Sequence, residues 1–128
     1  MKTRFTVALS MLAGIALGAV AVQGIHAQSR VSTYYVAEVE VADLEGYAKE
    51  YLPREESNIR AFGGRILAAG PRIATIEGDP PKSHALLLVW DDIEKMQSWR
   101  NAPESREIQA VGHKYAKFRA FTIEGRPR

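Results

Sequence analysis

The pattern of hydrophobic and polar residues predicts a strand followed by a helix at the start of a small domain. Residues 34–41 alternate between apolar and polar positions, which is typical of a strand with one buried face. Asp43 is a good helix N-cap, and the residues after it carry apolar side chains at helical spacing: Leu44, Tyr47, Tyr51, Ile59 and Phe62. Pro53 suits the first turn of a helix better than its interior, so we expect a kink or restart near residues 52–54.

Glycines and prolines divide the middle of the chain. Gly63 and Gly64 can supply the left-handed conformation that ends a helix. Residues 65–69 are predicted to form a second strand, and residues 73–77 a short continuation or companion strand. Residues 78–81 read Gly-Asp-Pro-Pro, which predicts a loop.

The remaining segments predict a third strand, two helices and a fourth strand. Residues 85–90 are wholly apolar, which is typical of a strand covered on both faces. Asp91 and Glu94 then fit a capping box, with Asp91 as the N-cap of a helix that carries Met96 and Trp99. The segment 101–104 ends this helix and starts another. Residues 118–123 alternate again and predict the last strand.

The order β-α-β-β-α-β predicts an α+β, ferredoxin-like domain over residues 34–125, with both helical segments on one face of an antiparallel sheet. Apolar residues point in both directions on the third and fourth strands, and such a face is rarely left uncovered. We therefore expect a homodimer in which two sheets face each other, with a pocket between sheet and helices in each copy.

The amino terminus predicts export. Lys2 and Arg4 precede an uncharged, mostly apolar run over residues 5–22, and Ala27 is a small residue suited to signal-peptidase cleavage. Residues 1–27 are therefore predicted to be a signal peptide, residues 28–33 a short leader and residues 126–128 a tail. The protein would act in the periplasm or be secreted, with no membrane contact after cleavage. An uncleaved membrane anchor is the alternative, because 18 residues approach the length of a membrane span.

The net charge and the absence of cysteine limit the kinds of partner and covalent link that the sequence predicts. The chain has 17 basic and 15 acidic residues, and the predicted signal peptide takes two of the basic ones with it. A neutral domain has no electrostatic footprint for nucleic acid or an anionic membrane. The chain has no cysteine, so neither disulfides nor a lipid-modified cysteine can form.

Several short segments resemble a bacterial family known as domain of unknown function 1330. They are residues 34–39, 45–47, 62–65, 77–79, 102–104 and 123–125, together with Trp99. The resemblance spans about residues 33–125. It implies a dimeric α/β barrel built from ferredoxin-like units, and it implies no activity.

Four residues are candidates for ligand binding. His84 opens the third strand, where it could act as a general base or bind an anion, or simply mark the strand start. Arg65 could hold a carboxylate or pair with Glu38 or Glu77. Tyr35 and Trp99 could form aromatic pocket walls or ordinary core.

Other polar residues favour structural roles. We expect His113 and the pair Glu55 and Glu56 to be solvated, and the acidic pair at residues 91–92 to cap a helix. The two histidines of the domain are too far apart in sequence for a recognisable metal motif, and no cofactor is predicted. The sequence predicts a protein that binds or transforms a small organic molecule, without deciding whether it is an enzyme. A non-catalytic dimeric interaction module and a haem-handling, monooxygenase-like protein are the alternatives.

Overall fold

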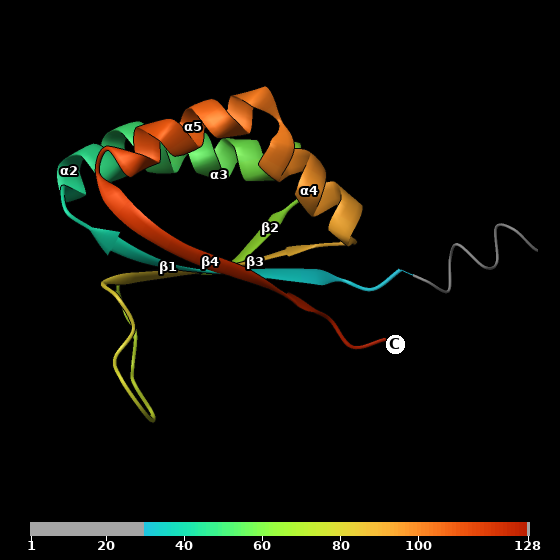
Figure 1. Ribbon diagram of the computed structural model, residues 1–128, viewed down its shortest axis with the longest axis horizontal. Coiled ribbons are helices and arrows are strands. Elements are labelled where there is room, and N and C mark those ends of the chain that lie inside the picture. The colour runs from blue at the N-terminus through green and yellow to red at the C-terminus, as the bar shows by residue number, and fades with distance from the viewer. Residues whose placement is uncertain (1–29, 128) are drawn as a thin grey trace, which may run out of the picture. The chain divides into compact units, whose positions relative to one another are not determined.

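The computed structural model describes residues 30–127, so the predicted signal peptide lies outside the described part of the chain. Four strands form one antiparallel sheet in the order β2-β3-β1-β4. The strands are β1 (Thr33–Val41), β2 (Arg65–Gly70), β3 (His84–Trp90) and β4 (Ala116–Glu124). The helices all lie on one face of this sheet (Figure 1), and the α+β ferredoxin-like prediction is confirmed. They are α2 (Leu44–Gly46), η1 (Tyr47–Tyr51), α3 (Leu52–Ala61), α4 (Ile93–Asn101) and α5 (Pro103–His113).

Strand β1 is central and has the two faces that its alternating sequence predicts. Tyr35, Ala37 and Val39 are buried against the helices. Ala37 pairs with Leu86 of β3 and with Ala120 of β4, so these three side chains share the inner face. This inner face and the apolar stripes of the helices form the hydrophobic core.

The first helical segment restarts at Pro53, as predicted, because proline is tolerated in the first turn of a helix but not in its interior. The Asp43 side chain accepts a hydrogen bond from the backbone N–H of Gly46 at 3.1 Å, as its predicted capping role demands. The chain then makes a π-helical turn in η1, and Pro53 lies in the first turn of α3. Proline has no N–H to donate and its ring crowds the preceding turn, so the wider π turn accommodates it.

Two predictions about local structure are wrong. Residues 73–77 form no strand; they lie in an exposed loop, where Ile76 is 94% exposed. Strand β2 ends at Gly70, which has a φ of 126°, and Pro71 after it cannot donate to a ladder. The N-cap of α4 is Asp92, whose Oδ1 accepts a hydrogen bond from the N–H of Lys95 at 2.9 Å.

The outer face of the sheet carries apolar side chains, as the sequence predicts. Val36 of β1 lies between Leu87 of β3 and Phe121 of β4. Phe121 is 43% exposed and Ile123 is 55% exposed, so part of this apolar face meets solvent in a single copy of the chain.

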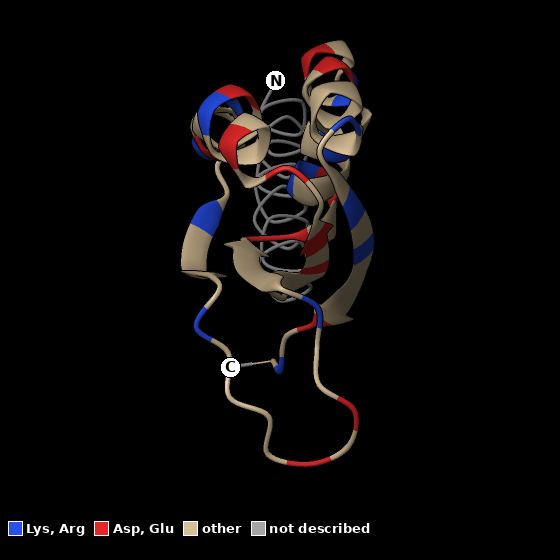
Figure 2. Ribbon diagram, turned by 90° about the vertical axis from the view of Figure 1, so that its left-hand side faces the viewer, with Lys and Arg blue, Asp and Glu red and all other residues tan. Residues whose placement is uncertain are grey.

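Acidic and basic residues are interspersed along the helices in the view of Figure 2. Within residues 30–127, no helix combines the length and apolar character needed to cross a membrane.

Candidate functional site

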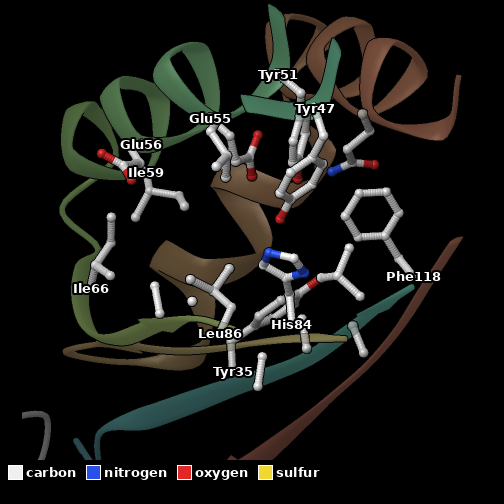
Figure 3. Close-up of a pocket in the computed structure, with 18 of the residues that line it drawn as sticks. Tyr35, Tyr47, Tyr51, Glu55, Glu56, Ile59, Ile66, His84, Leu86 and Phe118 are labelled. Carbon is white, nitrogen blue, oxygen red and sulfur yellow. The ribbon is translucent and has the colours of Figure 1, made fainter. Parts of the chain in front are cut away.

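A cavity of about 370 Å³ lies between the inner face of the sheet and the helices (Figure 3). Its volume falls in the range of small-molecule binding sites. Most of the wall is apolar and comes from β1, β2, β3, β4 and α3. The apolar lining includes Val39, Leu52, Ile59, Ile66, Leu86 and Phe118.

Glu55 is the most unusual residue of the cavity. It lies on α3 four residues after Tyr51 and four before Ile59, so the helical period places all three on one face. Glu55 is only 4% exposed, and Figure 3 shows its side chain reaching from α3 toward the cavity. Its Oε2 atom has no hydrogen-bond partner among the described residues.

Burial changes the acidity of this carboxyl group. Loss of solvation raises the pKa of Glu55 to about 7, and the positive charge of Arg100 opposes part of that rise. Both protonation states are therefore populated near neutral pH. The prediction that Glu55 is solvated is wrong, because α3 turns this residue toward the sheet together with Tyr51 and Ile59.

Two tyrosines extend the polar part of the cavity. The rings of Tyr47 and Tyr51 lie 5.3 Å apart, and both residues are buried. Burial, followed by the charges of Glu55 and Glu56, raises the pKa of Tyr47 to about 12. Burial also raises the pKa of Tyr51. Both hydroxyls therefore remain protonated at neutral pH and can donate hydrogen bonds.

His84 forms part of the cavity floor. It is paired with Val39 on the inner side of the sheet, and its ring centroid lies 5.7 Å from that of Tyr47. Figure 3 shows the imidazole below Tyr47, on the side of the cavity opposite Glu55. Its Nδ1 atom lies 3.2 Å from the Ser83 hydroxyl. His84, which the sequence suggested as a ligand-binding residue, therefore lies in the cavity wall.

Tyr35 and Trp99 also border the cavity, within an aromatic cluster. The Trp99 ring lies 4.9 Å from Trp90, and the Tyr35 ring meets Trp99 edge-on at 5.3 Å. Trp99 is 1% exposed, and its indole Nε1 has no hydrogen-bond partner in the described part of the chain. These two residues thus serve both as core and as cavity wall.

Arg65 lies apart from the other three candidates. It is exposed at the start of β2, where it pairs with Val89 on the outer side of the sheet, and it does not line the cavity. Its suggested partner Glu38 instead forms an ion pair with Arg119 at 2.8 Å.

His113 and Gln109 of α5 also contribute to the polar lining, as do Glu56 of α3 and Arg100 of α4. His113 is exposed as predicted, yet its ring packs edge-on against Phe118 at 5.3 Å and borders the cavity. The Gln109 side-chain nitrogen is buried and has no partner among residues 30–127. The same residues contain no cluster of three metal-ligating side chains.

Sequence reasoning missed Glu55 and Gln109 as cavity residues. For Glu55, the four-residue spacing to Tyr51 and Ile59 was a usable signal. Gln109 follows the buried Ile108, and its position offers no comparable signal in the sequence.

Comparison with known proteins gives a family and a fold. The family profile described as "Domain of unknown function (DUF1330)" matches residues 32–126. No functionally curated protein is significantly similar to this chain in sequence.

Solved structures share the fold at low sequence identity. A protein of unknown function from Rhodopseudomonas palustris has a TM-score of 0.61 and 13% identity, covering 84% of this chain and 94% of that chain. SnoaB, a cofactor-independent oxygenase from Streptomyces nogalater, has a TM-score of 0.57 and 12% identity, covering 77% and 96%. A conserved protein from Methanosarcina mazei has a TM-score of 0.51 and 16% identity, covering 79% and 99%. At these identities the likeness establishes the fold alone.

Proposed function

Because the chain belongs to the family of domain of unknown function 1330, whose description assigns no activity, we propose a function from the cavity itself. The cavity binds a small, mostly apolar organic molecule that contains a carbonyl group, and Glu55 donates a hydrogen bond or a proton to that oxygen. The observation that carries the proposal is the buried Glu55 carboxyl in a mostly apolar cavity, with an Oε2 atom that has no hydrogen-bond partner among residues 30–127.

The chemistry follows from the protonation state of Glu55. A carboxyl group with a pKa of about 7 is partly protonated at neutral pH and can act as a general acid. A carbonyl oxygen is the acceptor that such an acid recognises, and the apolar wall favours the hydrocarbon part of the same molecule. SnoaB, described as a cofactor-independent oxygenase, is an example of catalysis on a fold of this kind without a cofactor.

Binding of β-tetralone and of tetralin, its analogue without the carbonyl oxygen, tests the proposal. We expect calorimetric titration to show tighter binding of β-tetralone at pH 6, with a smaller preference at pH 8, where Glu55 is largely ionised. Glu55→Leu should bind both probes alike, because leucine cannot donate a hydrogen bond. Glu94→Gln is the matched control, because Glu94 is an exposed residue of α4 that does not line the cavity, and it should keep the preference. A preference that survives in Glu55→Leu, or no binding of either probe, would refute the proposal.

We also propose that two copies of the chain pair through the outer face of the sheet. The support is the apolar surface around Phe121 and Ile123. Sedimentation equilibrium should show a dimer that Phe121→Asp converts to a monomer. Leu44→Asp is the control, because Leu44 is 61% exposed on the helical side of the domain and should leave the dimer intact. A monomeric wild-type protein would contradict this pairing.

Export is a further proposal, which rests on the basic start, apolar run and small residue of the first 27 positions. Amino-terminal sequencing of protein from the periplasm or medium should find Gln28 as the first residue. Membrane-bound protein that begins at Met1 would favour the uncleaved anchor.

A further inference from the structure

The Ser83 hydroxyl connects the backbone of β1 to the imidazole of His84. The N–H of Val41 donates a hydrogen bond to Ser83 Oγ at 3.1 Å. Ser83 Oγ donates in turn to the carbonyl oxygen of Val39, also at 3.1 Å. The third neighbour of Oγ is Nδ1 of His84 at 3.2 Å.

Proton counting assigns the direction of the third contact. A serine hydroxyl has one proton and two lone pairs. The proton is directed to the Val39 carbonyl, which can only accept, and one lone pair receives the Val41 N–H. The second lone pair remains for His84, so the imidazole must be the donor in this contact. We infer that Ser83 holds neutral His84 as the Nδ1–H tautomer, which leaves Nε2 as a proton acceptor for a molecule in the cavity.

This tautomer deepens the proposed function, on which its catalytic part rests, by naming a base and a substrate class. His84 on β3 and Glu55 on α3 border the same cavity from opposite layers of the fold. A neutral imidazole with a free Nε2 accepts a proton, whereas a protonated Glu55 donates one. The substrate class that uses both groups is an enolisable carbonyl compound. Ser83 is a positioning residue, since it acts through His84 and does not line the cavity.

The proton-transfer step balances within these groups. A C–H bond next to the carbonyl breaks and its proton forms an N–H bond at Nε2 of His84. The carbonyl oxygen takes the proton of Glu55, so the product is the enol, with an imidazolium and a carboxylate left on the protein. Return of the proton to the same carbon, with return of the enol proton to Glu55, regenerates both residues and exchanges the hydrogen. In a β,γ-unsaturated carbonyl compound the enol is a dienol, and return of the proton to its γ carbon moves the double bond into conjugation with the carbonyl group.

Imidazole ¹⁵N chemical shifts measure the tautomer without any ligand. At a pH where His84 is neutral, the wild-type protein should show Nδ1 protonated and Nε2 unprotonated, with signals assigned by their loss in His84→Gln. Ser83→Ala should move the equilibrium toward Nε2–H, and Ser83→Thr, which keeps the hydroxyl, should preserve Nδ1–H. Amide spectra check that each variant is folded. A wild-type Nε2–H tautomer, or a Ser83→Ala spectrum identical to wild type, would overturn the inference.

Deuterium exchange of β-tetralone in heavy water tests the catalytic role separately. The wild-type protein should accelerate exchange next to the carbonyl, and His84→Gln should lower the rate by about a hundredfold. Ser83→Ala should fall between these two with β-tetralone affinity unchanged, and Ser83→Thr should recover. A correct tautomer without accelerated exchange would sink the proton-transfer function and leave the Ser83 assignment standing. Accelerated exchange that Ser83→Ala does not reduce would refute the positioning role.

Discussion

Glu55→Gln should stabilise the protein at pH 8 and have little effect near pH 4.5. The pKa of Glu55 is about 7 in the folded state, whereas the ordinary value for glutamate is 4.5. The folded state therefore holds the proton more tightly than the unfolded state does. The contribution of the protonated carboxyl is fully present below pH 4.5, and it is lost as the pH rises to about 7. At about 1.4 kcal/mol per pKa unit, the ionised carboxylate costs the fold on the order of 3 kcal/mol above pH 7.

Glutamine has nearly the same shape as a protonated glutamate and does not ionise, so it removes this cost. Urea unfolding at several pH values between 4.5 and 8 measures the difference in the free energy of unfolding. The gap between Glu55→Gln and wild type should open by about 3 kcal/mol across that range. Glu56→Gln serves as the control, because the Glu56 side chain is 45% exposed and water solvates its charge. Parallel pH profiles for wild type and Glu55→Gln would show that Glu55 is not desolvated.

Two further predictions concern the packing and the capping of the helices. Gly112→Ala should destabilise the protein by about 1 kcal/mol in urea unfolding, because a Cβ there would lie 2.7 Å from the Tyr51 ring and the crowding outweighs the better helix propensity of alanine; an increase in stability would show that the ring moves freely. Asp92→Ala should cost about 1 kcal/mol through loss of the helix cap, whereas Asp91→Ala should cost clearly less, because its contact with Lys95 is an exposed ion pair. The reverse order of thermal stabilities would make Asp91 the cap.

Local signals predicted much of the fold. The alternation of apolar and polar residues in β1 and the position of Pro53 are signals that depend on only a few neighbouring residues. The structure agrees with both. The two neighbouring acids at residues 91–92 are chemically equivalent as caps. Which of the two residues caps the helix depends on which one has an extended backbone immediately before the first helical turn. The residue types alone do not show this.

The cavity was less predictable, because it depends on parts of the chain that are distant in sequence. Glu55 looks like a solvated residue in a charged stretch of helix, and its burial requires the sheet and the neighbouring helices around it. Ser83 and His84 follow the long loop after β2. The hydrogen bonds that join Ser83 to β1 and to His84 form only in the folded chain, where the end of this loop lies beside β1. The sequence correctly predicts that Arg65 lies on a strand. The face of the sheet that carries its side chain, however, depends on the pairing of β2 with β3.

The two neighbouring tryptophans give this protein an intrinsic fluorescent reporter of the cavity. The chain contains two tryptophans, Trp90 and Trp99, and both lie in one aromatic cluster, with Trp99 in the cavity wall. All of the intrinsic indole fluorescence therefore originates at one place, beside the cavity. A compound that enters the cavity changes the surroundings of Trp99, whose ring lies 4.9 Å from that of Trp90. Libraries of small molecules can thus be screened against the unlabelled protein before any substrate is known.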